Sequence, residues 1–543
     1  MSVRAPGWAV ATILVVGGAV RIVAAFVPGS LQFDELATAL NVTERGWVEL
    51  LEPLGYHQVA PLGFIAAERL GIALLGVGEA GLRLFPLLVS IASLVLFWRV
   101  AVRFLTGSTL VPAVALFAVS PALVWYGRKA KQYAGDVFAV LVLLLLALRL
   151  MEGRYSARRA WLAGALGGLV ILVSHPSTVV AAGLFVVLVV DAWRTKKPLR
   201  ALVPVGLLWG LGALIQITTT EMLTPTSTRV FMTDAWDFAF VPAPWQSVRA
   251  FLWLPRRLFH FAGFIVGLMR PDTPWETAFV GLYAVLAILG SVYLIRHAGA
   301  PAMFLFIPLV IAILLSALRI LPLAGRIMLY VGPTLVVTCL AGLKQIEPWL
   351  PLRSRRALAV FLVAAPAVFL PFLLWALARH QDADRVLQDV RERWQSGDVI
   401  YVYQGAAGAM KFYGEPLGLT PWIAGRDHGR DVRAYLSDVD TLRGSPRAWY
   451  FYTHGMGCGV VQIRSYLEAM GTELIWIDDP YGLHGLQEAA AGLYDLSVPD
   501  RLGGSSAATH PLLERGDPRC RGAESTGAGI RDRLRGFLAG DGG

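Results

Sequence analysis

Long apolar runs recur along most of this chain, and they constrain its fold more than any other feature. Residues 160–173, 178–190 and 357–378 approach the length of about 20 residues that a helix needs to cross hydrocarbon. Only 16% of the 543 residues are charged, whereas about a quarter are charged in a soluble domain. The sequence therefore predicts an α-helical polytopic membrane protein.

The apolar runs and the charges between them predict a topology. We expect about eleven spans, near residues 8–28, 81–103, 109–126, 135–151, 160–174, 177–193, 200–219, 276–295, 301–318, 327–345 and 357–378. With Arg4 inside, each loop expected in the cytoplasm is basic, as the positive-inside rule requires. An odd number of spans leaves the C-terminal region outside. We therefore expect a multi-pass protein of the plasma (inner) membrane with an extracytoplasmic C-terminal domain.

One apolar segment does not fit this count. Residues 61–77 are short and are interrupted by Glu68 and Arg69. If they crossed the membrane, every later loop would change sides and the basic clusters would face outward. We therefore expect an interfacial amphipathic helix in an outer loop at 29–80, and a second interfacial helix near 255–269. Together with the spans, these segments make residues 1–380 the transmembrane module.

The composition changes after residue 380. Alternating segments at 399–403, 448–452 and 474–477 predict strands, and 406–413 and 461–470 predict helices. A small α/β domain is therefore expected over 381–500. Residues 501–543 are rich in Gly, Ser and Arg and are expected to form a flexible tail.

The net charge of +10 does not indicate nucleic-acid binding, because the basic residues fall in short clusters between apolar runs. Of the three cysteines, Cys339 lies in an apolar run and is expected to be inert. Cys458 and Cys520 both lie in the part expected outside the cytoplasm, where a disulfide between them stays open. Gly-rich stretches at 164–168 and 206–212 lie within spans and predict close helix packing rather than phosphate loops.

Several cations oppose the topology rule. Arg128, Lys129 and Lys131 lie in a loop expected outside. The other outer cations are Arg21, Arg83, Arg319 and Arg326. Each one alone is explained by snorkelling toward headgroups. As a set at one membrane face, they are better explained by an anionic group, and a lipid phosphate is the obvious candidate.

An acidic pair stands out in the first outer loop. Asp34 and Glu35 follow directly on the end of a membrane span, in Ser30-Leu-Gln-Phe-Asp-Glu. This position places a carboxylate at the membrane surface, within reach of a lipid-linked group. Two Asp-x-Asp patterns, at 382–384 and 438–440, are expected to be surface turns or helix caps rather than metal sites.

An ordered set of motifs carries a family resemblance. It begins with Arg21 and Asp34-Glu35, and continues with Tyr56-His57-Gln58-Val-Ala-Pro61, Gly78-Glu79 to Arg83, Ser120-Pro121, Trp125-Tyr126, Lys131-Gln132-Tyr133 with Asp136, and Gly325-Arg326 to Pro333. In this order the chain resembles the GT-C superfamily of membrane glycosyltransferases, which includes protein O-mannosyltransferases and the lipid A aminoarabinose transferase. The chain departs from the family at Gln58-Val-Ala-Pro61, where many members have His-Pro-Pro or Lys-Pro-Pro.

The resemblance implies transfer of a sugar from a polyprenyl-phosphate donor to a lipid, polysaccharide or protein acceptor on the outer face, with inversion. Asp34 is the expected base, with Glu35 as its orienter or substitute. The residues expected to bind the donor phosphate are Arg128, Lys131, Arg326 and Arg83. Those expected to support the substrate site are Tyr56, His57, Gln58, Glu79, Gln132, Tyr133 and Asp136. Some relatives bind a metal through a second acid, so a divalent ion (Mg or Mn) at Glu79 or Asp136 stays open.

Two other functions would fit a chain of this kind. A transporter or flippase of lipid-linked glycans would explain the spans and the outer cations. Transporters, however, usually bind near the bilayer midplane with repeated, broken helices, and no internal repeat is visible in this sequence. A catalytically inactive scaffold is the second alternative.

Overall fold

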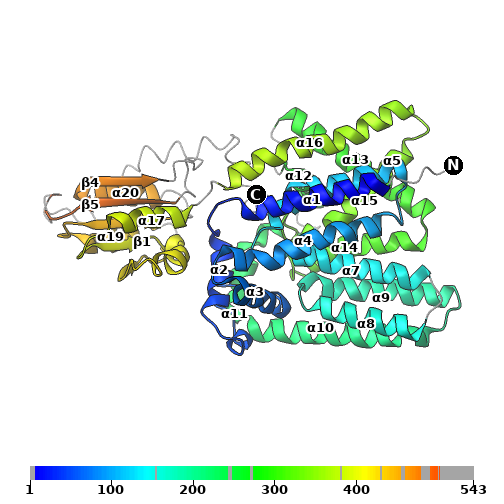
Figure 1. Cartoon of the computed structure of the whole chain (residues 1–543), viewed down its shortest axis with the longest axis horizontal. Helices are drawn as coiled ribbons and strands as arrows, with labels where there is room; N and C mark the ends of the chain where they lie inside the picture. Colours follow the sequence, from blue (N-terminus) through cyan, green and yellow to red (C-terminus); the bar gives the residue numbers. More distant parts are fainter. Residues whose placement is uncertain are drawn as a thin grey trace. The chain divides into compact units, whose positions relative to one another are not determined.

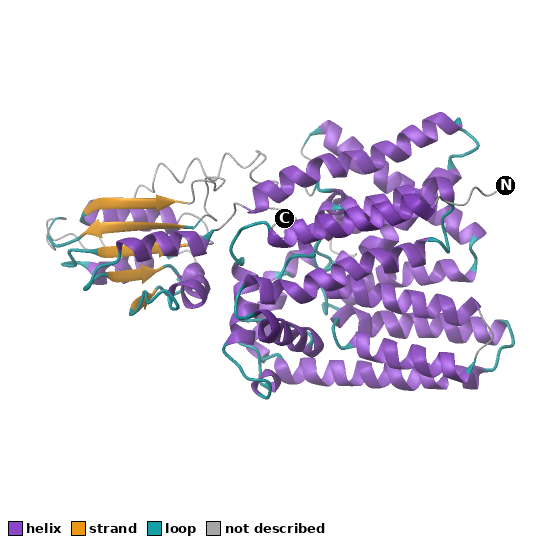
Figure 2. Cartoon of the chain, in the orientation of Figure 1, coloured by secondary structure: helices purple, strands orange, loops and turns teal. Residues whose placement is uncertain are grey.

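The structure is a computed structural model that describes residues 7–152, 156–242, 248–268, 273–378, 382–428, 431–453, 459–478, 489–498 and 501. The chain divides into two compact units. The transmembrane unit combines Met1–Val27 with Asn41–Leu374 and with Arg533–Gly543, which lies outside the described residues. The C-terminal unit combines Pro28–Leu40 with Trp375–Asp532. Among the described residues, every strand belongs to the C-terminal unit (Figures 1 and 2).

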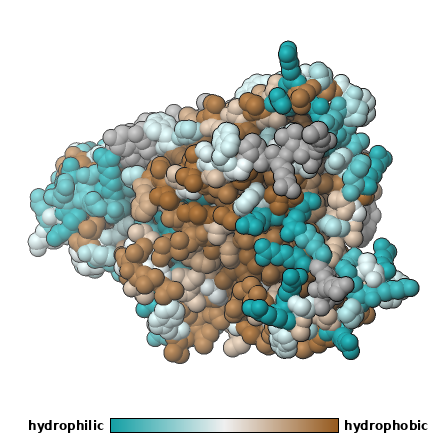
Figure 3. All heavy atoms as spheres, turned by 45° about the vertical axis from the view of Figure 1, so that its right-hand side comes forward, coloured by the Kyte–Doolittle hydropathy of each residue, from teal (hydrophilic) through white to brown (hydrophobic). Residues whose placement is uncertain are grey.

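Eight helices in the described part of the chain are long and apolar enough to cross a membrane. They are α1 (Gly7–Phe26), α4 (Glu79–Ala101), α7 (Tyr133–Glu152), α9 (His175–Arg194), α10 (Val203–Leu223) with the preceding turn η2 (Leu199–Leu202), α13 (Pro274–His297), α14 (Ala300–Ala317) and α16 (Leu352–Ala378). Apolar side chains cover much of the visible surface of these helices (Figure 3). On α10, for example, Leu207 and Leu214 are 62% and 59% exposed, as expected of side chains that face lipid.

Shorter helices complete the transmembrane unit. They are α3 (Leu62–Leu75), α5 (Gly107–Val119), α6 (Pro121–Tyr126), α8 (Ala157–Ile171), α11 (Thr226–Ala235), α12 (Val248–Val266) and α15 (Gly332–Gln345), with the short turns η1 (Glu49–Leu51), η3 (Asp237–Ala239) and η4 (Leu329–Val331). The prediction of a polytopic helical membrane protein is confirmed. The segment expected as one span at 109–126 is broken at Ser120, because Pro121 disfavours helical backbone in the residue before it. Helix α12 begins earlier than the predicted 255–269 segment and includes Pro255.

Small residues allow the helices to approach closely. A Cβ atom on Gly290 of α13 would collide with the Thr338 carbonyl of α15, and one on Gly342 would collide with the Leu286 carbonyl. Helices α8 and α10 pack in the same way, since a Cβ on Gly168 would lie 2.6 Å from the Leu208 carbonyl oxygen. The prediction that these glycine-rich stretches pack helices is confirmed.

Arg21 anchors α1 to the helices beside it. Its guanidinium donates to the carbonyls of Ala118 at 2.8 Å and Phe117 at 3.2 Å, and to the Ser90 hydroxyl at 3.0 Å. The side chain is only 2% exposed. Arg21 therefore satisfies the carbonyls that end α5, and its role here is structural.

The C-terminal unit is built around a five-stranded sheet. Its strands are β1 (Val399–Val402), β2 (Trp422–Ala424), β3 (Ala448–Tyr452), β4 (Thr472–Asp478) and β5 (Ala490–Asp495), in the order β2-β1-β3-β5-β4. Strands β2, β1 and β3 are parallel, whereas β5 is antiparallel to both β3 and β4. The helical segments are α2 (Phe33–Thr43, of which the residues to Leu40 belong here), α17 (Ala383–Arg393), α18 (Ala407–Ala409), α19 (Val432–Val439) and α20 (Gly459–Met470), with the turns η5 (Gln404–Ala406), η6 (Met410–Gly414) and η7 (Asp440–Leu442).

The predicted small α/β domain is confirmed, but two of its strands were not predicted. Strand β2 has only three residues, and β5 begins Ala-Ala-Gly, which has low strand propensity. Strand β5 forms because it is buried between β3 and β4, a context that local sequence does not reveal. Cys339 is buried and free, while Cys458 and Cys520 lie outside the described residues.

Candidate active site

A buried hydrogen bond joins two of the predicted site residues. The Lys131 ammonium donates to the Gln58 side-chain carbonyl, with 2.5 Å between Nζ and Oε1. Lys131 lies just before α7 and Gln58 just before α3, 73 positions apart, and the two residues are 6% and 8% exposed. Lys131 is thus a buried cation, and a buried ammonium favours a negatively charged group near it.

The turn that presents Gln58 is strained. The Gln58 amide donates to the Gly55 carbonyl at 3.2 Å, and the two residues between them, Tyr56 and His57, have φ angles of 57° and 51°. Left-handed backbone costs a non-glycine residue about 1–2 kcal/mol. Asn41 holds the turn, because its side chain bonds both the amide and the carbonyl of Gly55, at 2.8 and 3.1 Å. Strain of this kind tends to gather at functional sites.

Tyr56 and His57 have contacts that secure this turn. The Tyr56 hydroxyl lies 3.1 Å from the Glu44 carboxylate, and the His57 ring stacks on Phe231 of α11 with 4.6 Å between ring centroids. We therefore regard Tyr56 and His57 as residues that position Gln58.

Two cations share one indole ring in the loop before α7. The Arg128 guanidinium lies 5.1 Å and the Lys129 ammonium 4.5 Å from the centre of the Trp125 ring. Both residues are buried, and Arg128 also donates to the Val27 carbonyl at 3.0 Å. Cations held so close together favour an anion beside them.

Arg326 completes a second group of stacked cations. Its guanidinium lies 5.9 Å from the Tyr133 ring centre and 5.3 Å from that of Trp236. Two residues after Trp236, the Phe238 ring has a cation–π contact with Arg257, whose guanidinium lies 5.3 Å from the ring centre. Sequence reasoning singled out Arg326 and Tyr133 but missed Trp236. The sequence feature that could have indicated Trp236 is the alternation of aromatic residues at 236, 238 and 240. In the structure, an arginine stacks on each of these rings.

Arg83 and Glu79, both predicted site residues, are partners of each other. They lie one turn apart on α4, with 2.8 Å between their charged atoms. Arg83 also lies 3.5 Å from the Ala25 carbonyl. Arg83 thus has a carboxylate partner within the protein, and its contact with a donor phosphate stays a prediction.

Buried polar atoms without hydrogen-bond partners gather around the start of α7. Asp136 is 5% exposed and bonds to Ser174, but its Oδ1 atom has no partner among the described residues. The same holds for Oε1 of Gln132 and for the hydroxyl of Tyr330. Buried polar groups are normally paired, so such atoms are candidates for contacts with a ligand or water.

The acidic pair lies in the first turn of α2, within the C-terminal unit. Glu35 is 1% exposed, and its Oε2 atom accepts the Gln32 amide at 3.1 Å, which is half of a capping box. Asp34 is partly exposed. Two bonds secure this segment inside its unit: Leu31 donates its amide to the Tyr413 hydroxyl at 2.8 Å, and Ser30 bonds Asp382 at 3.0 Å. Glu35 therefore caps the helix that presents Asp34.

A metal site needs several donor side chains close together. No three His, Cys, Asp or Glu side chains come together in a metal-binding arrangement within the described ranges. Of the Asp-x-Asp residues, Asp382 precedes α17 as its cap residue, whereas Asp438 pairs with Arg426 and His428 and Asp440 pairs with Arg443. Asp382 makes no side-chain capping bond to α17, and the Ser30 hydroxyl accepts the Asp384 amide at 2.9 Å instead. The described donor sets do not fit a divalent ion, and we derive no step through one.

Comparison with known proteins identifies the fold. The chain resembles ArnT from Cupriavidus metallidurans in the crystal structure bound to undecaprenyl phosphate, with 15% identity and a TM-score of 0.51 over 90% of this chain and 98% of that chain. The apo ArnT structure gives 14% identity and a TM-score of 0.52 over 91% and 98%. The chain has the GT-C fold.

A family model matches part of the chain. Residues 59–217 match the family model described as dolichyl-phosphate-mannose-protein mannosyltransferase. This range runs from just before α3 into α10 and includes Lys131 and Asp136. The mycobacterial arabinofuranosyltransferase AftD is 17% identical with a TM-score of 0.47, over 89% of this chain and 40% of that chain. No curated protein matches. The resemblance to the GT-C superfamily is confirmed.

Proposed function

We propose that the chain is an integral membrane glycosyltransferase of the plasma (inner) membrane. It moves a sugar from a polyprenyl-phosphate donor to an acceptor on the outer face, with inversion, and its C-terminal unit is extracytoplasmic. The observation that carries this proposal is the buried Lys131–Gln58 pair beside the cations stacked on Trp125. It occurs in the fold of ArnT, a protein crystallised with undecaprenyl phosphate.

In this proposal the cations act on the leaving group. When the bond between the sugar and the phosphate breaks, the phosphate gains negative charge. Lys131 and Arg128 are already buried and oriented, so they stabilise that charge without reorganising. Arg326, stacked on Tyr133 and Trp236, is the third candidate, because a guanidinium stacks on aromatic rings with its faces and binds phosphate oxygens in its plane. Gln58 orients the Lys131 ammonium.

Asp34 is the proposed base. An acceptor hydroxyl is a weak nucleophile, and a positioned carboxylate contributes about 10²–10⁴-fold by accepting its proton. Asp34 lies seven residues after Val27, whose carbonyl accepts from Arg128, and seven residues before Asn41, which holds the Gln58 turn.

The test is sugar release from a panel of radiolabelled polyprenyl-phosphate monosaccharides by the purified chain in lipid nanodiscs. We expect turnover of one donor that disappears in Asp34→Asn and Lys131→Met and persists in Lys344→Gln. Lys344 pairs with Glu347 near the end of α15 and is the charge-matched control. If all four proteins behave alike on every donor, while the chain in proteoliposomes moves lipid-linked glycan across the bilayer, the chain is a transporter or flippase and the transferase proposal is wrong.

A further inference from the structure

The sheet of the C-terminal unit has a topological switch point. From β1 the chain adds β2 on one side and then β3 on the other side, and all three strands are parallel. Loops that leave the carboxyl ends of such strands in opposite directions open a crevice, where open α/β sheets generally bind ligands. Gln404 follows β1 at this edge, and Arg426, Asp427 and His428 follow β2.

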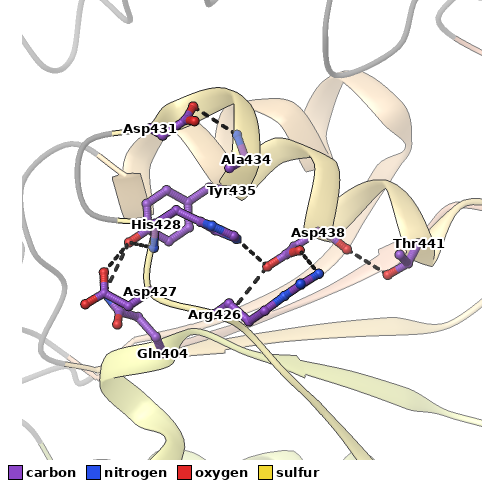
Figure 4. Close-up of polar contacts among 9 residues, drawn as sticks. All are labelled: Gln404, Arg426, Asp427, His428, Asp431, Ala434, Tyr435, Asp438 and Thr441. Carbon is purple, nitrogen blue, oxygen red and sulfur yellow. Dashed lines mark hydrogen bonds and ion pairs between the residues drawn. The ribbon is translucent and has the colours of Figure 1, made fainter.

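A network of side chains covers this edge (Figure 4). The Gln404 amide nitrogen donates to the Asp427 carboxylate and to the Tyr435 hydroxyl, both at 3.1 Å. The Tyr435 hydroxyl in turn donates to Asp427 at 3.4 Å and accepts the His428 amide at 3.2 Å. Each polar group is therefore held in one orientation by at least one other.

The second half of the network centres on Asp438 in α19. Its carboxylate lies 2.8 Å from the His428 Nε2 atom and accepts the Arg426 guanidinium at 3.1 Å (Figure 4). Burial raises the pKa of Asp438, whereas the hydrogen bonds from His428 and from the Arg426 amide lower it. The hydrogen bonds outweigh burial, so the pKa lies below its usual value. Because an ionised carboxylate only accepts, the Nε2 atom of His428 carries a hydrogen.

Stability alone is a weak explanation of this network. The Arg426 side chain is 80% exposed and Asp427 is also exposed. Exposed ion pairs contribute about 0–1 kcal/mol. Bonds between side chains are also the rare class, about 10–15% of hydrogen bonds in proteins. Polar side chains that hold one another in fixed orientations at a surface are typical of a preorganised binding site.

An unpaired buried hydroxyl lies directly beneath the same loop. Tyr401 is 1% exposed, and its hydroxyl has no hydrogen-bond partner among the described residues. A Cβ atom on Gly425 would lie 2.6 Å from this hydroxyl, so the glycine next to Arg426 keeps the space beside it open. Buried polar atoms of this kind indicate a missing partner such as a ligand group or water.

The chemistry of the edge selects a class of ligand. Two carboxylates repel a phosphate, and the described side chains form no group that would hold a metal ion. Donors and acceptors of both charge signs, side by side, match neighbouring hydroxyls, each of which donates and accepts at once. We propose that this edge, made by Gln404, Arg426, Asp427 and His428, binds the hydroxyls of a neutral glycan. The inference rests on the proposed function and deepens it, since it makes the acceptor a saccharide.

The test uses the full chain in nanodiscs and an array of neutral oligosaccharides with two to six hexopyranose or pentofuranose units, followed by saturation-transfer NMR on the best binder. Arg426→Ala and Asp427→Asn are the site variants. Glu468→Gln, which alters a partly exposed pair with Arg464 on α20, is the matched control. We expect binding of at least one oligosaccharide, weakened at least tenfold in both site variants and unchanged in the control, with equal unfolding temperatures throughout.

Other outcomes overturn the inference. Binding that survives in both site variants places the glycan elsewhere, and binding to no oligosaccharide removes the ligand class. Titrations with inorganic phosphate and calcium chloride as probes would reveal an anion or cation site instead, which also contradicts the proposal. Because this assay needs no sugar donor, its result stands apart from that of the Asp34→Asn transfer assay. Loss of one therefore does not imply loss of the other.

Discussion

Lys131 and Gln58 share a buried hydrogen bond of 2.5 Å that joins the start of α7 to the turn before α3. If this bond orients the ammonium on a donor phosphate, Gln58→Ala should lower kcat/KM about 10- to 100-fold, since bonds to charged groups contribute about 1.5–3 kcal/mol. Lys131→Met should lower it about 100- to 1,000-fold. Steady-state kinetics with the donor found in the panel provides the measurement. An equal loss in Lys344→Gln would show that the effect is not local.

Asp34 and Glu35 are adjacent yet should respond differently to mutation. Asp34→Asn should abolish transfer without changing the unfolding temperature, because the partly exposed side chain keeps its shape. Glu35→Ala removes the carboxylate that caps the Gln32 amide, so it should destabilise the protein by about 0.5–2 kcal/mol. Glu35→Gln keeps an acceptor oxygen and should retain most of the activity. Transfer assays and thermal unfolding separate the two roles, and an inactive, stable Glu35→Gln would make Glu35 catalytic.

Asn41 should matter to both folding and activity. Asn41→Ala leaves the Gly55 amide and carbonyl without their side-chain partner, which should cost about 1–3 kcal/mol and release the strained turn. The expected readouts are a lower unfolding temperature and a higher KM for the donor, because Gln58 is no longer held. As a comparison, Arg45→Ala removes bonds to Glu52 and Pro53 on an exposed part of the same loop and should affect KM much less.

The C-terminal unit should lose stability in acid through Asp398. Burial raises the pKa of this carboxyl group, but hydrogen bonds from Arg447, Trp449 and the Gln395 amide outweigh burial, and the pKa lies below its usual value. A lowered pKa stabilises the folded state above the unfolded value, near pH 4, and the contribution disappears as the pH falls through the lowered pKa.

Hydrogen–deuterium exchange of β1 and β3 in the full chain, corrected for intrinsic rates, would measure this loss. Asp398→Asn should be less stable at pH 7 and should show a weaker dependence on pH between 5 and 2, since the group no longer titrates. A native chain whose β1 and β3 remain equally protected across that range would contradict the assignment.

The sequence predicted the helical architecture because a bilayer imposes length and apolarity on every span. It also predicted β1 and β3, whose Val, Ile, Trp and Tyr residues favour strands. It did not predict β2 or β5, because their short or small-residue sequences form strands only through their neighbours in the sheet.

The sequence predicted which residues belong to the candidate site, but not which of them contact one another. Lys131 and Gln58 were both singled out, yet nothing local reveals that they bond across 73 positions. The turn that allows this has left-handed backbone at Tyr56 and His57, where neither residue is the glycine that would have signalled it. Trp236 was missed because its significance depends on Arg326, which lies in a distant segment.

The crossing of α13 and α15 bears on how such a chain can change over time. At Gly290 and Gly342 the backbones meet so closely that even a methyl group would wedge the helices apart. Exposed apolar positions on α13, such as Val285 and Ile288, can exchange one aliphatic residue for another, because lipid accepts any of them. Substitutions on a lipid-facing surface thus have little effect on the fold, whereas almost any substitution of Gly290 or Gly342 would disturb it. A fold held this way can be retained at 15% sequence identity, because a few contact positions constrain it and most of the sequence does not.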